Sequence, residues 1–385
     1  MAWGARDVME QRIEFVVKAW QAGSNLSELC REYAVSRPTG YRWLKRYEEV
    51  GSVRGLSEKS RRPQHSPGRT AREMEDRVVE LRQRYGWGAK KLVVLLAREG
   101  IALKVVTVNR ILKRRGLLVP EECVRPATQR FEREAPNQLW QMDFKGPWQV
   151  AEGWCYPLTL LDDHSRYLVG LHGLRGTDGG GVAGGLLKTF EAYGVPEAML
   201  MDHGTPWWST TNGHGLTWVS VGLIQQGIRL YYSGVRHPQT QGKVERLHRS
   251  LKHQVDRRGR PGTLAASERA LAEFREEYNQ VRPHEALGME VPAKRYQPSR
   301  KAYDPHPREW EYGAGNQVKR LNTQGCLDYQ QGRYFVCEAL AEERVCIERI
   351  KDKLLVRYRH TYVREIDLLS GRTTAVVLPD LPLGV

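Results

Sequence analysis

Three acidic residues of the chain occupy positions that suit ligand binding: Asp143, Asp202 and Glu245. Asp143 and Asp202 each end a short apolar stretch, and Glu245 lies in the polar segment HPQTQGKVERLHR. An acid that directly follows a strand-like apolar stretch gains nothing from the core beside it, so ligand binding would give it a reason to be there. Taken singly, each Asp is more often a turn or capping residue. The set of three, in this order and with these flanks, indicates a shared role.

That role would be metal binding, because hard cations such as Mg²⁺ and Mn²⁺ take oxygen ligands. Two such ions roughly 4 Å apart can activate an attacking oxygen and stabilise the leaving oxygen in an in-line displacement at phosphorus. Three carboxylates are a sparse ligand set for two dications and leave positions open for phosphate and water. We therefore predict that Asp143, Asp202 and Glu245 bind two Mg²⁺ or Mn²⁺ ions and catalyse phosphoryl transfer, provided that the fold brings them together.

The segment around Glu245 is predicted to be a helix over residues 240–255 with two different faces. Its apolar residues recur at intervals of three and four and would be buried: Val244, Leu247, Leu251 and Val255. The other face carries Gln241, Glu245, His248, Arg249 and Lys252, of which Arg249 and Lys252 would position DNA phosphates. The alternative is an ordinary surface helix with Glu–Arg and Glu–Lys pairs.

The elements around these acids predict a ribonuclease-H-like α/β core. A strand meander is predicted over 139–150, 155–162 and 167–172, followed by a helix from the Gly-rich stretch at 176–185 to about 192. A strand at 198–201, a helix at 219–226, a strand at 228–232 and a helix at 265–279 complete the core. Asp162 and Asp163 compete for a ligand role, but they precede His-Ser-Arg in a predicted hairpin turn, where Asp is ordinary. Residues 316–372 are strand-like and would fit a small all-β barrel.

The N-terminal segment predicts a helix-turn-helix, with helices at 8–21, 26–34 and 39–49. Ser36 is the expected N-cap of the third helix, and Pro38 is tolerated in its first turn. We predict DNA contacts from residues at and near the start of that helix: Arg37, Thr39, Tyr41 and Arg42. The alternative is a helical hairpin with a solvated basic face.

A basic segment and a second helical module follow. Residues 51–69 are rich in Gly, Ser, Pro and Arg, which predicts an extended linker whose Arg61 and Arg62 contact DNA or are merely solvated. Helices at 71–85, 88–99 and 106–115, the last with Thr107 as a candidate cap, predict a second helix-turn-helix, with or without a wing. The predicted domains are 1–50, the linker 51–69, 70–120, the catalytic core 136–300 and the barrel 310–375.

Composition agrees with a DNA-binding multidomain protein. The chain has 385 residues and a formal net charge of +15, which favours binding to a polyanion such as DNA. Its content of apolar (40%) and charged (27%) residues is typical of a globular protein. The first residues do not resemble a signal peptide, and no apolar run approaches a membrane span. The cysteines are scattered without a Cys-x-x-Cys pair, which favours reduced thiols and disfavours structural zinc. We expect a cytoplasmic protein without a membrane partner.

Four segments carry a family resemblance: LWQMDF at Asp143, LLDDHSRY, MDHGTPW at Asp202 and HPQTQGKVERLHRSLK at Glu245. They resemble the catalytic core shared by retroviral integrases and bacterial insertion-sequence transposases, the DDE family, as does the later segment YNQVRPHEALGMEVPAKRY. The likeness covers about residues 136–296. It implies a ribonuclease-H-like core, Mg²⁺ bound by the acidic triad, and a homo-oligomer acting on element ends.

The chain departs from that pattern in three ways. The gap between Asp202 and Glu245 is longer than in retroviral integrases, with the extra sequence around 209–218. Helix-turn-helix units replace the His/Cys zinc module. His203 stands where many relatives have Asn, which puts its local role in doubt.

The sequence therefore predicts a transposase that binds the ends of its element, cleaves them and joins the 3′-hydroxyls to target DNA. Direct transesterification requires neither a covalent protein intermediate nor ATP, and no Gly-x-x-x-x-Gly-Lys-[Ser/Thr] loop is present. Two alternatives remain at this point: a catalytically retired DNA-binding regulator and a ribonuclease-H-like nuclease that does not join strands.

Overall fold

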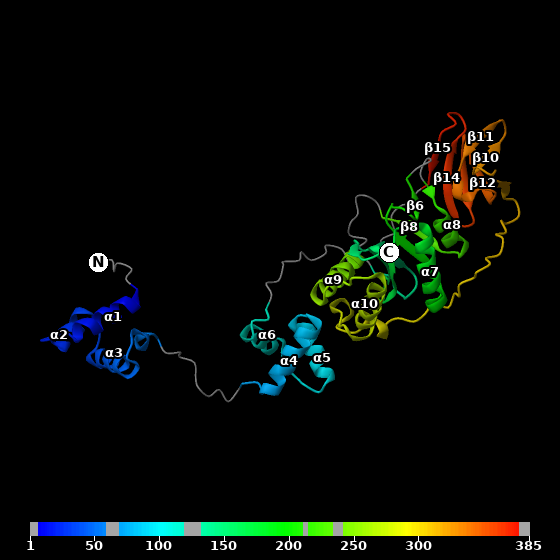
Figure 1. Cartoon of the computed structure of the whole chain (residues 1–385). Coiled ribbons are helices and arrows are strands. Elements are labelled where there is room, and N and C mark those ends of the chain that lie inside the picture. The colour runs from blue at the N-terminus through cyan, green and yellow to red at the C-terminus, as the bar shows by residue number, and fades with distance from the viewer. Residues whose placement is uncertain (1–6, 59–68, 119–131, 211–214, 234–241, 377–385) are drawn as a thin grey trace. The chain divides into compact units, whose positions relative to one another are not determined.

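A computed structural model describes residues 7–58, 69–118, 132–210, 215–233 and 242–376 (Figure 1). The chain divides into two compact units, Met1–Thr70 and Ala71–Val385, and each is described by itself. None of the helices within the described ranges is long and apolar enough to cross a lipid bilayer.

The first unit is a small helical bundle. It contains α1 (Val8–Ala19), α2 (Leu26–Glu32), α3 (Arg37–Val50) and the short 3₁₀ helix η1 (Val53–Leu56). Ser36 is the N-cap of α3 and Pro38 lies in its first turn, as predicted. Gly40 allows close helix crossing, because a Cβ there would lie 2.8 Å from both Phe15 and Cys30. Leu56 is fully buried in this core, so the unit continues beyond residue 50, where the linker was expected to begin.

The second unit begins with three helices around an apolar core, α4 (Arg72–Tyr85), α5 (Ala89–Arg98) and α6 (Val105–Arg114). The cap predicted for α6 is wrong: the helix begins at Val105, so Lys104 is its N-cap and Thr107 lies inside it. Between residues 69 and 118 the structure contains no strand, so no wing is formed there.

A mixed six-stranded sheet forms the centre of the second unit. Its strands are β1 (Trp140–Phe144), β2 (Trp148–Val150), β3 (Gly153–Asp162), β4 (Leu168–Leu174), β5 (Ala198–Met201) and β8 (Arg229–Tyr232). Strand β3 pairs antiparallel with β1, β2 and β4, whereas β1–β5 and β5–β8 are parallel. An antiparallel meander extended by parallel strands is the predicted ribonuclease-H-like arrangement.

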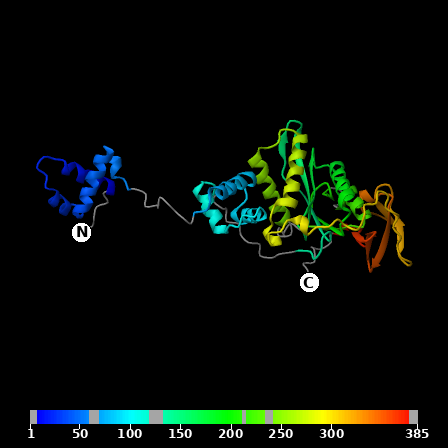
Figure 2. The same cartoon turned by 90° about the horizontal axis from the view of Figure 1, so that it is seen from below.

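Helices cover both faces of this sheet (Figure 2). They are α7 (Gly179–Tyr193), α8 (Trp218–Gln225), α9 (Gly242–Arg258) and α10 (Leu264–Glu276), which continues into the π-helical turn η3 (Glu277–Val281). One apolar cluster joins α9 and α10 to Leu161, Leu168 and Leu171. Another joins α7 and α8 to Leu158 and Leu160. Adjacent Leu160 and Leu161 therefore serve opposite faces, next to a register shift in β3.

The C-terminal strands form an open sheet, so the predicted barrel is wrong. The strands are β9 (Gln317–Arg320), β12 (Arg344–Ile350), β13 (Lys353–Tyr358), β14 (Thr361–Asp367) and β15 (Thr373–Ala375). Their order is β15-β14-β13-β12-β9, and within the described residues the two outer strands do not pair with each other. A separate hairpin contains β10 (Cys326–Tyr329) and β11 (Gly332–Phe335). Three 3₁₀ turns lie at Glu285–Leu287 (η4), Pro292–Lys294 (η5) and Glu338–Leu340 (η6).

The open sheet shares its core with the central sheet. One continuous apolar cluster contains Met199 of β5, Ile224 of α8 and Val356 of β13. The described part of the extra sequence around 209–218 lies at this junction: β6 (Trp208–Ser209) pairs with β7 (Gly215–Leu216). The Cys337 thiol donates to the Leu216 carbonyl at 3.3 Å, which ties β7 to the C-terminal region.

Candidate active site

Asp143 and Asp202 lie beside each other at the ends of neighbouring parallel strands. In the β1–β5 pairing, Trp140 is opposite Met199 and Gln141 is opposite Leu200. Extending this register by two residues brings Asp143 opposite Asp202, which directly follows β5. The two-residue periodicity of strands thus explains why both acids emerge at the same edge of the sheet.

Glu245 comes from the first turn of α9, the helix packed against this part of the sheet. The predicted apolar face is confirmed, because Val244, Leu247, Leu251 and Val255 are all buried. Glu245 is exposed, as are Arg249 and Lys252. Gln241 lies outside the described residues, and His248 is largely covered by the sheet.

The carboxylate of Asp143 lies within electrostatic reach of both other acids. The pKa of Asp143 is raised to about 7, first by burial, then by the negative charge of Asp202, and to a smaller extent by Glu245. The backbone N–H of Phe144, which donates to Asp143 Oδ1 at 2.8 Å, opposes this rise only partly. A buried acid beside other acids favours the charged form only when a cation is close, so these oxygen donors suit a divalent metal.

The residues do not form a closed ligand set by themselves. Within the described part of the chain, no three His, Cys, Asp or Glu side chains lie close enough together to hold one metal ion. The structure therefore brings Asp143 and Asp202 to one edge and leaves Glu245 nearby on α9, within electrostatic reach of Asp143.

Trp207 holds Asp202, a contact that the sequence reasoning missed. Its indole N–H donates to Asp202 Oδ1 at 2.8 Å and to the Asp202 carbonyl at 3.0 Å. The ring is fully buried and stacks on Phe144, which follows Asp143, with ring centroids 5.5 Å apart. Gly204 is also close to Asp202, because a Cβ there would lie 3.0 Å from both Asp202 carboxylate oxygens. In the sequence, the tryptophan that ends the segment MDHGTPW could have indicated this contact.

His248 links α9 to Asp143 through Thr159. The Thr159 hydroxyl donates to the Asp143 carbonyl at 2.8 Å, so the His248 Nε2–H must donate to Thr159 Oγ1, 2.9 Å away. His248 Nδ1 lies 3.9 Å from Asp143 Oδ2. Burial lowers the pKa of His248 to about 4, so the ring is neutral near pH 7 and contributes no positive charge.

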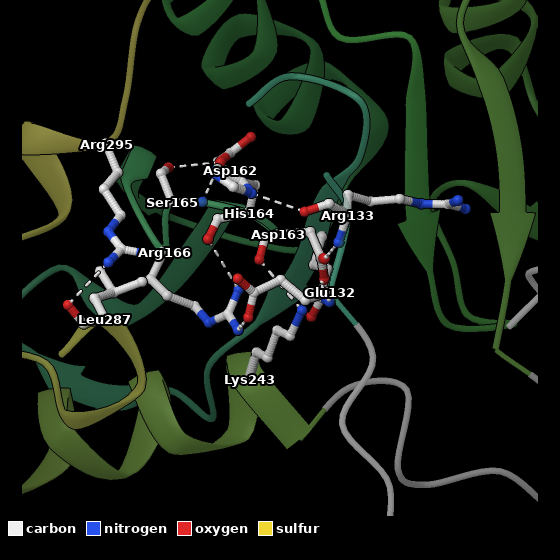
Figure 3. Close-up of polar contacts among 11 residues, drawn as sticks. Glu132, Arg133, Asp162, Asp163, His164, Ser165, Arg166, Lys243, Leu287 and Arg295 are labelled. Carbon is white, nitrogen blue, oxygen red and sulfur yellow. Dashed lines mark hydrogen bonds and ion pairs between the residues drawn. The ribbon is translucent and has the colours of Figure 1, made fainter. Parts of the chain in front are cut away.

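The neighbouring acids Asp162 and Asp163 are fully buried and already hydrogen-bonded. Asp162 accepts bonds from Ser165 and from the backbone of Asn137, which fixes the β3–β4 turn. Asp163 accepts bonds from Lys243 and the backbone of Arg133 (Figure 3), and also from Gln141. These contacts give both acids structural roles that agree with discounting them as ligands.

His203 makes contacts with neighbouring parts of the fold. Its Nδ1 lies 2.9 Å from the carbonyl oxygen of Ser233, just after β8. Its ring contacts the rings of Trp208 and Tyr232. The residue therefore connects the loop after β5 to β8.

The predicted DNA-contacting residues of the first unit lie at the start of α3. Arg37, Tyr41 and Arg42 are exposed, whereas the Thr39 hydroxyl is bonded to Arg42 at 3.1 Å and to Ser36 at 2.9 Å. Arg61 and Arg62 lie outside the described residues. The DNA roles of all of them, like the domain boundaries, remain predictions.

Four family models match segments of the chain. Two models described as integrase core domain match residues 133–238 and 226–292. A helix-turn-helix domain model matches residues 11–64, and a homeodomain-like domain model matches residues 39–112.

The similar proteins include products of bacterial insertion elements. A 31.7 kDa protein of insertion element IS407 from Burkholderia multivorans is 27% identical over 232 residues, covering 57% of this chain and 78% of that protein. A 39.2 kDa protein of IS476 from Xanthomonas euvesicatoria is 25% identical over 288 residues, covering 72% of this chain and 80% of that protein.

Solved structures show a weaker likeness. The HTLV-2 integrase catalytic core domain in complex with magnesium is 15% identical with a TM-score of 0.33, covering 42% of this chain and 97% of that one. The simian T-cell lymphotropic virus intasome in complex with a PP2A regulatory subunit is 12% identical with a TM-score of 0.39, covering 80% and 98%. Likeness at this level carries no further conclusion about this chain.

Proposed function

We propose that this chain, an integrase-core protein with helix-turn-helix domains and insertion-element relatives, is the transposase of a mobile DNA element. Asp143, Asp202 and Glu245 would form its catalytic, metal-binding triad. It would cleave the phosphodiester at the element's ends and join the freed 3′-hydroxyls to target DNA. We expect it to act as a homo-oligomer on DNA in the cytoplasm, without ATP.

The observation that carries this proposal is the strand register that brings Asp143 beside Asp202 at one edge of the sheet, with Glu245 on the helix packed against it. The pKa of Asp143 is raised to about 7 by burial and by both other acids, so a bound cation would stabilise its charged form. Bound Mg²⁺ or Mn²⁺, as two ions, would supply Lewis-acid activation of the attacking oxygen and stabilisation of the leaving oxygen.

The chain's own residues would orient this chemistry. Asp143 lies on β1 and Asp202 directly follows the adjacent strand β5, so the sheet restricts their separation, and the Trp207 bond restricts the rotation of Asp202. Glu245 lies on a helix whose buried face is anchored, and the exposed Arg249 and Lys252 follow it along α9. Cations at these positions would hold the DNA phosphates while the acids face the reacting bond.

Isosteric substitution of the acids tests the proposal. Asp143→Asn, Asp202→Asn and Glu245→Gln should each abolish cleavage and leave binding to the element's ends nearly unchanged, since each removes one metal ligand. The substrate is a duplex carrying the inverted repeats that flank the gene, incubated with Mg²⁺ or Mn²⁺ and, as a control, with a chelator. Near-wild-type cleavage by one variant would remove that residue from the triad.

The same reaction separates a transposase from a nuclease that only hydrolyses. Adding a labelled target duplex should yield strand-transfer products in which the element's 3′ end is joined to target DNA. Cleaved ends without joined products would favour the nuclease. Specific binding without cleavage by the wild-type chain, under any of these metal conditions, would favour the retired regulator.

A further inference from the structure

A buried acid–base pair connects the two elements that carry Asp143 and Glu245. We call the three side chains of Gln141, Asp163 and Lys243 the Asp163 junction; Figure 3 labels Asp163 and Lys243. Asp163 Oδ1 accepts hydrogen bonds from Gln141 Nε2 at 2.7 Å and from Lys243 Nζ at 2.5 Å. Lys243 Nζ also donates to the Asp163 carbonyl at 3.2 Å. One carboxylate oxygen therefore binds a strand and a helix together.

Asp163 is itself held in place from several directions. Its backbone N–H donates to the Leu139 carbonyl at 2.9 Å, and its Oδ2 accepts from the backbone N–H of Arg133 at 2.8 Å. The Asp163 side chain is fully buried, and that of Lys243 is 16% exposed. A carboxylate with this many bonds has little freedom to move, so it can serve as a fixed reference point for α9.

The sequence positions of its partners are what connect the Asp163 junction to the triad. Gln141 is two residues before Asp143 on β1, so both side chains lie on the same side of the strand. Lys243 is two residues before Glu245, in the first turn of α9. Each partner of Asp163 is therefore close in the chain to one proposed metal ligand.

A second contact fixes α9 on the other side of Glu245. His248, three residues after Glu245, donates to Thr159 Oγ1 at 2.9 Å, and Thr159 is bonded to Asp143. Glu245 thus lies between two polar attachments of α9 to the sheet. Apolar packing of Val244 and Leu247 can hold a helix against a sheet but tolerates sliding and rotation, which directional bonds at both ends resist.

We propose that Asp163 and Lys243 are positioning residues that set the distance of Glu245 from Asp143 and Asp202. The proposal rests on the function proposed above, since it assigns the pair a role in assembling that triad. Neither side chain needs to touch metal or DNA. Without the Asp163 junction, α9 would remain folded and packed, but its first turn would hold Glu245 in a broader range of positions.

The test compares Lys243→Met and Lys243→Arg with a matched control, Lys353→Met, in the full chain. Lys353 forms a similar 2.5 Å ion pair with Glu365, but in the C-terminal sheet. Cleavage of the flanking-repeat duplex is measured while Mg²⁺ or Mn²⁺ is titrated, at a temperature where circular dichroism shows every variant to be folded. End binding is measured in parallel.

We expect Lys243→Met to cleave at least ten-fold more slowly than wild type and to need several-fold more Mg²⁺, with end binding unchanged. Mn²⁺, which tolerates looser ligand geometry than Mg²⁺, should recover part of the rate. Lys243→Arg, which keeps a cation for Asp163, should recover more than Met does, and Lys353→Met should behave as wild type. Asp163→Asn combined with Lys243→Met should be no slower than Asp163→Asn alone, because both act through the same contact.

Wild-type cleavage and metal dependence in Lys243→Met would overturn the proposal. So would a lower melting temperature with an unchanged Mg²⁺ requirement, because that result assigns the pair a purely structural role. Glu245→Gln, run in the same assay, separates this failure from failure of the proposed function. An active Glu245→Gln refutes the triad, whereas an inactive Glu245→Gln beside a fully active Lys243→Met refutes only the positioning role.

Discussion

The indole N–H of Trp207 donates to Asp202 Oδ1 at 2.8 Å, while the same ring stacks on Phe144 next to Asp143. One buried side chain thus contacts the surroundings of two acids from different strands. Trp207→Phe keeps an aromatic ring but removes the donor, a bond to a charged group worth roughly 1.5–3 kcal/mol. We expect cleavage to fall about ten-fold or more, because 1.36 kcal/mol corresponds to ten-fold in rate.

The neighbouring residue provides the control for this prediction. Trp208 is buried as well, but its ring contacts His203 and Tyr232. Trp208→Phe should affect thermal stability more than the cleavage rate. Equal loss of cleavage in both variants at matched stability would show that Asp202 does not depend on the Trp207 bond.

Gly204 is predicted to leave the space that the Asp202 carboxylate needs to keep its position. The Cβ of an alanine would lie 3.0 Å from both carboxylate oxygens, so the acid would have to shift. We expect Gly204→Ala to raise the Mg²⁺ concentration required for half-maximal cleavage, with end binding unchanged. Gly222→Ala on α8 is the control, because a Cβ there meets nothing within 4 Å and should cost no activity. An unchanged Mg²⁺ requirement in Gly204→Ala would contradict the prediction.

The two faces of α9 can be distinguished by adjacent substitutions. Leu251 is 1% exposed, so Leu251→Ala should lower stability by about 2–5 kcal/mol. Lys252 is exposed, so Lys252→Ala should leave melting unchanged, weaken strand joining and reduce the salt slope of DNA binding by about one. Melting curves and joining assays at several salt concentrations measure both effects. Destabilisation by Lys252→Ala alone would contradict this assignment of faces.

His172 is predicted to make the fold sensitive to acid. Burial, aided by the charges of Arg275 and Lys188, lowers its pKa to about 4. The Thr189 hydroxyl donates to Gly185, so neutral His172 donates to Thr189 through Nε2. Histidine in the unfolded chain has a pKa near 6.5, so it binds a proton more readily than folded His172 does. The contribution of neutral His172 to the free energy of unfolding is therefore complete above pH 6.5 and is lost as the pH falls toward 4.

Replacing the imidazole should therefore flatten the pH dependence of stability. His172→Gln keeps a donor for Thr189, and between pH 6.5 and pH 4 it should lose about 2–3 kcal/mol less unfolding free energy than wild type does. The control is His306→Gln, at an exposed position, which should follow the wild-type curve. Parallel curves for wild type and His172→Gln would show that His172 is not an acid-sensitive group.

Local patterns in the sequence were sufficient for most helices and strands. Strand β5 occupies Ala198–Met201 as predicted, and the spacing of Val244, Leu247 and Leu251 identified the buried face of α9. Such patterns reflect the periodicity of buried positions within a single helix or strand, and residues close together in the sequence determine that periodicity. The N-cap of α6 was predicted wrongly because a Thr near the start of a helix resembles a capping residue even when the helix begins before it, as α6 does.

Features that depend on contacts distant in sequence could not be predicted. Closing a barrel requires the first and last strands to pair, and the alternation within β9 or β15 does not determine that. Lys243 and Asp163 are 80 residues apart, so nothing near either one indicated the pair. The sequence analysis treated Asp163 as a turn acid, and its link to α9 appears only once helix and sheet are packed.

The apolar cluster shared by Met199, Ile224 and Val356 has a consequence for how this protein can be divided. A fragment that stops near residue 300 would leave one side of that cluster facing water, and the strands beyond it would be left equally uncovered. Such exposed apolar faces promote self-association, so a recombinant fragment that contains the central sheet should extend past β15. The first helical unit has an apolar core of its own, so it can be removed or exchanged without uncovering that cluster.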